Sequence, residues 1–259
     1  MNLYSSFQFF MPTKVLFGNG QVEKIGEEAA ALGKKALLVT GKTAMRQAGI
    51  TGRIESKLAA NGIEVVLFEK VESNPSTETA EAGVELALES GCDLVIGLGG
   101  GSAIDTAKAI ASAAGLKTPL ITLMEQGMPK KGLPCIAVPT TSGTGAEVTG
   151  ISVLTIKARN RKDALRSPYN FPNVAIVDPE LTLNLSPYLT ANTGIDALTH
   201  AIEAFVSRSA HPVSDQYARQ AIALINKYLR RAVLAGNDLE ARTGMALASN
   251  LAGIAIAYA

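Results

Sequence analysis

The sequence is poor in several residue types, and each shortage argues against a class of protein. It has no Trp, 5% aromatic residues, two cysteines and two histidines among 259 residues. Cys92 and Cys135 lie in apolar surroundings, which indicates reduced core residues rather than a disulfide framework and suits a reducing compartment. The formal net charge of +1 argues against nucleic acid or an anionic membrane surface as a main partner.

Long apolar runs are missing as well. No uninterrupted apolar stretch reaches the ~20 residues of a membrane span, and the start MNLYSSFQFFMPTK lacks the basic region and apolar run of a signal peptide. Since 47% of the residues are apolar, the chain can still bury a sizeable core in one large or two ordinary domains. We therefore expect a soluble, cytoplasmic protein with no membrane partner.

Short apolar runs alternate with helical patterns along the first two thirds of the chain. Strands are expected at 15–17, 36–40, 63–68, 93–98, 135–138, 151–156 and 174–177. Helices are expected between them at 24–32, 44–61, 77–90 and 102–114. This alternation predicts an α/β domain with a mostly parallel, doubly wound, Rossmann-like sheet.

The pattern changes near residue 180, where we place a domain boundary. Pro179 and Pro187 predict a loop, after which helices are expected at 193–207, 212–235 and 238–258. The predicted organisation is a dinucleotide-binding α/β domain over 1–180, followed by the first part of an all-α domain over 181–259.

A glycine-rich loop follows the strand at 93–98. Gly99, Gly100, Gly101 and Ser102 stand between that strand and a helix, an arrangement that lets backbone N–H groups approach a diphosphate. The spacing departs from G-x-G-x-x-G because Ser102 stands where the last glycine would be. The alternative is a tight strand–helix turn in which Ser102 and Asp105 form a capping box.

A hydroxyl-rich loop follows the strand at 135–138. Thr140, Thr141, Ser142 and Thr144 stand at what would be the carboxyl end of a parallel strand, where dinucleotides bind. The alternative is a polar turn in which Thr144 and Glu147 cap the next helix.

Asp196 and His200 are spaced to share one face of a helix, so together they could hold a divalent metal. The alternative is a surface polar pair or a satisfied buried histidine. Apolar neighbours predict a largely buried helix, and burying both groups requires a partner. A catalytic metal needs about three protein ligands, and we expect His211 to be an exposed loop residue outside the site. The others would be carboxylates, another subunit's residues or residues absent from this chain.

Four segments occur in a recognisable order: GLGGGSAIDTAKA, PTTSGTGAEVT, VAIVDPELT and GIDALTHAIEAFVS. Together they resemble the iron-containing (group III) alcohol dehydrogenases, from the N-terminal strand to the last residue. The resemblance implies a dehydroquinate synthase-like architecture, in which a metal lies between a dinucleotide domain and a helical domain. It also implies reversible oxidation of a small alcohol to an aldehyde or ketone, using NAD or NADP.

The resemblance also assigns roles to single residues. Gly100, Gly101 and Ser102 would bind the diphosphate, and Asp105 would lie near the nicotinamide ribose. Other residues would line or touch the cofactor: Asn74, Thr140, Thr141, Thr144, Thr149 and Lys162. Asp196 and His200 would be the first two metal ligands, with Fe²⁺ expected and Zn²⁺ or Mn²⁺ as alternatives.

Cofactor preference depends on the residue after the second strand. A carboxylate there would accept the ribose 2′-OH and repel a 2′-phosphate. This sequence has Gly41 followed by Lys42, so NADP is permitted and slightly favoured over NAD.

The nearly all-apolar stretch 247–259 has no helix-closing signal. Family members continue beyond this point and carry two more metal-binding histidines there. We therefore expect a chain cut within a helix, whose own catalytic competence is open.

Other functions remain possible. The chain could be a non-catalytic dinucleotide-binding fragment, or a related enzyme of the same fold such as a glycerol dehydrogenase or a dehydroquinate synthase-like lyase. The combination of TTSGTGAEVT and GIDALTHAIEAF favours the alcohol dehydrogenases. A homodimer or higher homo-oligomer is expected, since the N-terminal strand could pair across a dimer.

Overall fold

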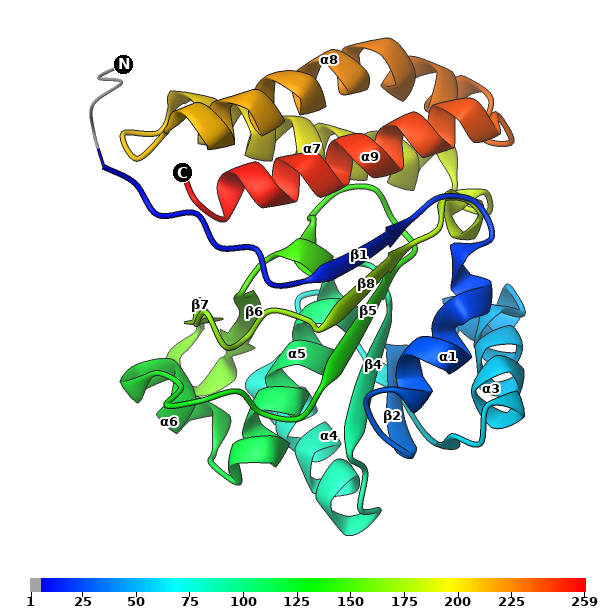
Figure 1. Cartoon of the computed structure of the whole chain (residues 1–259), viewed down its shortest axis with the longest axis vertical. Coiled ribbons are helices and arrows are strands. Elements are labelled where there is room, and N and C mark those ends of the chain that lie inside the picture. The colour runs from blue at the N-terminus through cyan, green and yellow to red at the C-terminus, as the bar shows by residue number, and fades with distance from the viewer. Residues whose placement is uncertain (1–5) are drawn as a thin grey trace.

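The computed structural model describes residues 6–259 and has an α/β layer and a helical layer (Figure 1). A six-stranded, all-parallel sheet has the order β1-β8-β5-β4-β2-β3. Its strands are β1 (Lys14–Phe17), β2 (Lys35–Gly41), β3 (Glu64–Val71), β4 (Leu94–Gly99), β5 (Cys135–Pro139) and β8 (Val174–Val177). The expected α/β class with a parallel sheet is confirmed. Residues 1–5 of the predicted first domain lie outside the described part.

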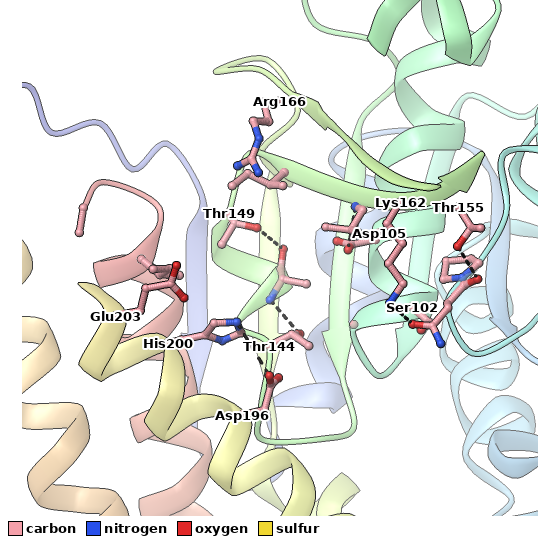
Figure 2. Close-up of a pocket in the computed structure, with 18 residues that line it drawn as sticks. Ser102, Asp105, Thr144, Thr149, Thr155, Lys162, Arg166, Asp196, His200 and Glu203 are labelled. Carbon is pink, nitrogen blue, oxygen red and sulfur yellow. Dashed lines mark hydrogen bonds and ion pairs between the residues drawn. The ribbon is translucent and has the colours of Figure 1, made fainter. Parts of the chain in front are cut away.

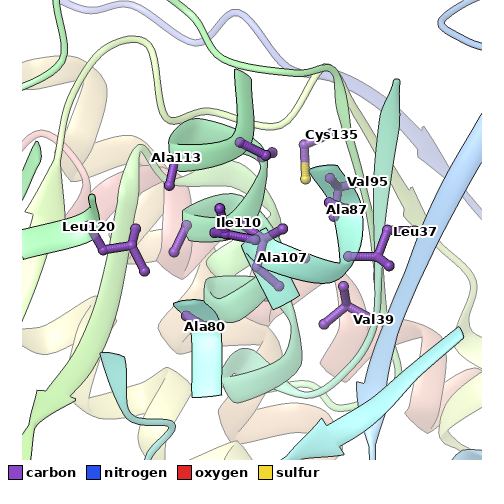
Figure 3. Packing of buried hydrophobic residues seen from close by; sticks show 14 of the residues in the cluster. Leu37, Val39, Ala80, Ala87, Val95, Ala107, Ile110, Ala113, Leu120 and Cys135 are labelled. Carbon is purple, nitrogen blue, oxygen red and sulfur yellow. The ribbon is translucent and has the colours of Figure 1, made fainter. Parts of the chain in front are cut away.

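Helices cover both faces of this sheet. They are η1 (Gln21–Lys24), α1 (Ile25–Ala30), α2 (Ala44–Gln47), α3 (Ile50–Ala60), α4 (Thr77–Glu89), α5 (Gly101–Leu116) and α6 (Leu120–Gln126). The side chains of β2 alternate between two cores, as the strand period requires. Leu37 and Val39 belong to a core that also contains residues of α4, α5 and α6, as Figure 3 shows, whereas Leu38 belongs to a core with α1 and α3. Cys92 and Cys135 are free and buried, as expected.

Some local predictions were wrong. The helix expected over 44–61 is split into α2 and α3, because Gly49 adopts a left-handed conformation with φ of 73°. Helix α6 was not predicted. Neither was β7 (Arg161–Arg166), which forms an antiparallel hairpin with β6 (Ile151–Ile156) across the short turn η3 (Lys157–Arg159).

After η4 (Pro179–Thr182), three long helices form the second layer: α7 (Pro187–Val206), α8 (Pro212–Leu234) and α9 (Leu239–Ile256). Helix α7 begins six residues earlier than the expected 193, because Ser186 caps it with a side-chain oxygen and Pro187 occupies its first turn rather than a loop. No helix within residues 6–259 is long and apolar enough to cross a membrane.

The expectation that the Asp196 helix is largely buried was wrong for one of its sides. Ile195, Ile202 and Val206 are 52%, 46% and 72% exposed, while Ala197, Ala201 and Ala204 on the other side are fully buried. Some apolar side chains of α7 are therefore left uncovered by α8, α9 and the other described residues.

The expectation that His211 is an exposed loop residue was also wrong. It is 6% exposed and caps α8, with Nδ1 accepting a hydrogen bond from the Ser214 N–H. Phe7 stacks on the imidazole with ring centroids 4.4 Å apart, and Phe9 covers it edge-on. Phe7 and Phe9, which are distant in sequence, thus bury the His211 side chain at the start of α8.

Candidate functional site

A pocket of about 630 Å³ lies between the carboxyl ends of β4 and β5, the β6–β7 hairpin and α7 (Figure 2). Most of the residues expected to bind cofactor or metal line it: Asn74, Gly101, Ser102, Asp105, Thr144, Thr149, Lys162, Asp196 and His200. Its wall also contains Pro75, Ala146, Ile151, Val153, Thr155, Arg166, Glu203, Ile256 and Ala259. The fold therefore brings the two predicted loops and the predicted metal pair to one pocket.

The glycine-rich loop starts α5 directly at the pocket. Strand β4 ends at Gly99, Gly100 is the N-cap residue, and among the described residues no side chain caps this first turn. The capping box of Ser102 and Asp105, which was the alternative for this loop, is therefore absent from this helix start. Uncapped N–H groups at a helix N-terminus suit an anion such as a diphosphate.

The hydroxyl-rich loop packs against the glycine-rich loop. The Thr140 N–H donates to the Gly99 carbonyl at 2.9 Å, so the loops begin side by side. A Cβ placed on Gly101 would lie 2.6 Å from Thr144 Cγ2, and one on Gly100 would lie 3.3 Å from Thr141 Oγ1. Gly101 and Thr144 line the pocket, whereas Gly100, Thr140 and Thr141, which were also expected to bind the cofactor, do not.

The alternative for this loop, a helix capped by Thr144 and Glu147, is not what the structure shows, since only a short 3₁₀ turn follows, η2 (Ala146–Val148). Thr144 Oγ1 accepts a hydrogen bond from the Ala146 N–H at 3.2 Å, but Glu147 does not complete a capping box. Instead, Glu147 is 3% exposed and accepts a hydrogen bond from Asn250 Nδ2 of α9 at 3.1 Å. Burial raises the pKa of the Glu147 carboxyl.

Asp105 faces the pocket from α5 with a side chain that is 15% exposed. Its Oδ2 accepts a hydrogen bond from the Val153 N–H at 3.1 Å, and its Oδ1 lies 3.0 Å from the Lys108 ammonium. Burial raises the pKa of this carboxyl, and the positive charge of Lys108 opposes that shift.

Asn74 and Lys162 close another side of the pocket. Lys162 Nζ donates to Asn74 Oδ1 at 2.6 Å, and Thr155 N–H donates to the Pro75 carbonyl at 2.8 Å. Asn74 has φ of 54°, an uncommon conformation for a residue with a side chain. The β6–β7 hairpin therefore holds the 74–76 turn over the pocket, where a cofactor could contact Lys162.

Asp196 and His200 lie on the pocket face of α7, as the helical spacing predicts. His200 Nε2 is 3.9 Å from Asp196 Oδ1, and the two side chains are 26% and 45% exposed. His200 Nδ1 is buried and has no hydrogen-bond partner among the described residues. A carboxylate beside a neutral imidazole, whose ring nitrogen can give a lone pair to a metal, suits a divalent metal ion. Residues 6–259 hold no group of three such ligands.

Gly41 ends β2, and its neighbour Thr40 pairs with Leu98 of β4, directly before the glycine-rich loop. Gly41 does not itself line the pocket. A Cβ placed on Gly41 would lie 3.7 Å from the Val71 carbonyl oxygen, which is an ordinary contact.

Sequence reasoning missed Lys108, Arg166 and Glu203. Lys108 stands within the GLGGGSAIDTAKA segment, but its hydrogen bonds go largely to backbone carbonyl groups, which no sequence pattern identifies. Glu203 stands one turn beyond His200, and that i+3 spacing could have found it.

The sequence matches the family described as "Iron-containing alcohol dehydrogenase" over residues 12–179, and the C-terminal region of the same family over 190–259. It is 45% identical over 242 residues to long-chain-alcohol dehydrogenase 1 of Geobacillus thermodenitrificans, covering 92% of this chain and 61% of that protein.

Two solved structures are similar across 98% of this chain. One is a 1,3-propanediol oxidoreductase, with a TM-score of 0.94, 40% identity and 67% of that chain covered. The other is sulfoacetaldehyde reductase from Bifidobacterium kashiwanohense in complex with NAD⁺, with a TM-score of 0.91, 37% identity and 68% covered. The chain spans less than two thirds of the length of long-chain-alcohol dehydrogenase 1, of which it covers 61%.

Proposed function

Because this chain belongs to the iron-containing alcohol dehydrogenase family, we propose that it is a metal-dependent, NAD(P)-linked alcohol dehydrogenase acting on a small alcohol or aldehyde. One observation carries the proposal: a single pocket contains the start of α5 and, facing it, Asp196 and His200. A dinucleotide and an alcohol oxygen would meet in such a pocket.

The chain's own groups have distinct tasks in this proposal. The first turn of α5 holds the diphosphate through its N–H groups, with Thr144 and Thr149 beside it. Lys162 holds the cofactor from the hairpin side. Asp196 and His200 hold the metal, which when bound supplies a Lewis acid that lowers the pKa of the alcohol, while the nicotinamide supplies the hydride acceptor.

The donor set fits Fe²⁺, with Zn²⁺ and Mn²⁺ as alternatives. Remaining ligands would be waters, residues of another subunit or residues outside the described ones. We also propose a homodimer or higher homo-oligomer. Gly41 and Lys42 place no carboxylate at the end of β2, so NADP and NAD are both admitted, with NADP slightly favoured.

The test is metal content and turnover of wild type and His200→Ala. Metal would be measured by mass spectrometry, and NADH and NADPH oxidation would be followed with butyraldehyde. We expect His200→Ala to lose metal and turnover and to keep dinucleotide binding. The control is His211→Asn, which retains an N-capping side chain at a residue that does not line the pocket. Unchanged metal content in His200→Ala would remove the metal assignment.

A second candidate is a non-catalytic dinucleotide-binding protein. It is favoured by the finding that residues 6–259 supply no third metal ligand beside Asp196 and His200. Wild type that binds dinucleotide but neither retains metal nor turns over would support this candidate instead.

A further inference from the structure

Lys108 is a buried lysine on α5 to which the proposed chemistry gives no task. It is 1% exposed and stands one turn after Asp105. Removing an ammonium from water is costly unless the charge is paired and hydrogen-bonded. Its partners therefore indicate what the charge does.

All of these partners belong to the pocket wall. Lys108 Nζ donates to the carbonyl oxygens of Ala146, at 2.9 Å, and of Ile151. It lies 3.3 Å from both the carbonyl oxygen and Oγ1 of Thr149, and 3.0 Å from Asp105 Oδ1. Each of these four residues lines the pocket, although Lys108 itself does not.

The carbonyls come from a segment that changes from the turn η2 to strand β6 within a few residues. Three carbonyl oxygens that converge on one point need a common donor, since buried backbone groups without partners are costly. The ammonium supplies that donor. Asp105, which pairs with the same ammonium, accepts from the Val153 N–H of β6. Two side chains one turn apart on α5 therefore hold the segment 146–153.

We propose that Lys108 is the positioning residue of this wall, fixing Asp105, Thr149 and Ile151 toward the nicotinamide half of a bound dinucleotide. Thr155 of the same strand contacts Asn74 and Pro75, and four residues of a strand span about 13 Å. Ile151 therefore lies well away from Asn74 and Lys162, which would hold the other half. The proposal rests on the dinucleotide binding proposed above.

The experiment compares Lys108→Met, which keeps side-chain length without the charge, with Thr13→Val, which removes one buried hydroxyl elsewhere. Thr13 is 4% exposed and donates to the Pro172 carbonyl oxygen at 2.9 Å, and neither of these residues lines the pocket. Dissociation constants for NADH and for ADP-ribose, which lacks nicotinamide, would be measured by fluorescence and calorimetry. Hydrogen exchange of 146–153 would be followed without cofactor.

We expect Lys108→Met to bind NADH about tenfold more weakly, with ADP-ribose affected no more than about threefold. Exchange over 146–153 should accelerate more than exchange over α1 and α3. Thr13→Val should show neither effect. Equal weakening of both nucleotides, or acceleration spread evenly over the protein, would overturn the proposal because it would indicate general destabilisation.

Wild type that binds neither nucleotide would contradict the proposed function, while exchange in the cofactor-free protein would still decide the role of Lys108. If Lys108→Met does not fold, Lys108→Arg replaces it. Its planar guanidinium keeps the charge but cannot direct its donors at the same point. Lys108→Arg should therefore also weaken the binding of NADH more than the binding of ADP-ribose. Equal weakening of the two affinities would again overturn the proposal.

Discussion

Gly101→Ala tests whether the glycine-rich and hydroxyl-rich loops are packed as tightly as the structure shows. The added Cβ would lie 2.6 Å from Thr144 Cγ2, 2.7 Å from its Oγ1 and 3.0 Å from its Cβ. Ordinary carbon contacts are about 3.5–4.0 Å, so the overlap is about 1 Å. Thr144 is β-branched and its Oγ1 accepts from the Ala146 N–H, so rotating it away sacrifices that hydrogen bond.

Overpacking of this kind costs about 1–3 kcal/mol, which in a protein of this size lowers Tm by about 2–4 °C per kcal/mol. Urea and thermal unfolding of Gly101→Ala would measure the loss. NADH binding should weaken in the same variant, because the clash moves the N–H groups that would hold the diphosphate. The double variant Gly101→Ala with Thr144→Ala should recover about 0.5 kcal/mol or more beyond additivity, since two of the three clashing atoms are gone.

Gly52→Ala is the matched control. Gly52 is in α3, and nothing lies within 4 Å of a Cβ placed there. The substitution should stabilise the protein by roughly 0.5–1 kcal/mol through helix propensity. The reasoning would be refuted if Gly101→Ala were as harmless as Gly52→Ala, or if Thr144→Ala returned none of the lost stability.

Two further predictions concern charge. Burial raises the pKa of Glu147 above its ordinary 4.5, so its protonated form favours folding and stability is lost as the pH rises through the raised pKa. Glu147→Gln should therefore be more stable than wild type at alkaline pH, and this gain in stability should shrink as the pH falls. A gain that does not depend on pH in urea unfolding would contradict the prediction. Gly41→Asp should weaken the binding of NADPH about tenfold, because the new carboxylate would repel the 2′-phosphate. The binding of NADH should change little, because the new Cβ makes only an ordinary contact. Equal effects in titrations of the two cofactors would place the ribose elsewhere.

The central strands were predictable because each is a short apolar run bounded by turn residues, as in β2 and β5. Strand β7 was missed because its sequence RKDALR is mostly charged and its pairing comes from the β6 hairpin. Helix α7 was predicted, but the exposure of its apolar side chains was not. A repeat of apolar residues identifies a helix, whereas tertiary packing decides which element covers each side of it.

The candidate site was predictable where loops follow strand ends, since those ends meet at one edge of a parallel sheet. Gly101, Thr144 and His200 reach one pocket for this reason. Lys108 was not predictable, because it contacts carbonyls 38 and more residues away, and every residue carries a carbonyl. His211 was misjudged because Phe7 and Phe9, which bury it, are distant in sequence.

The segment 140–151 couples the pocket to the helical layer. Gly145, with φ of 61°, approaches α9 so closely that a Cβ on it would lie 2.5 Å from the Gly253 Cα. A Cβ on Gly143 would lie 2.9 Å from Thr193 Cβ of α7. The same few residues carry Thr144 and Thr149 of the pocket and the carbonyls that Lys108 gathers. A ligand that orders this segment must therefore also restrain α7 and α9, so dinucleotide binding should slow hydrogen exchange in both helices, and an effect confined to the sheet would contradict the coupling.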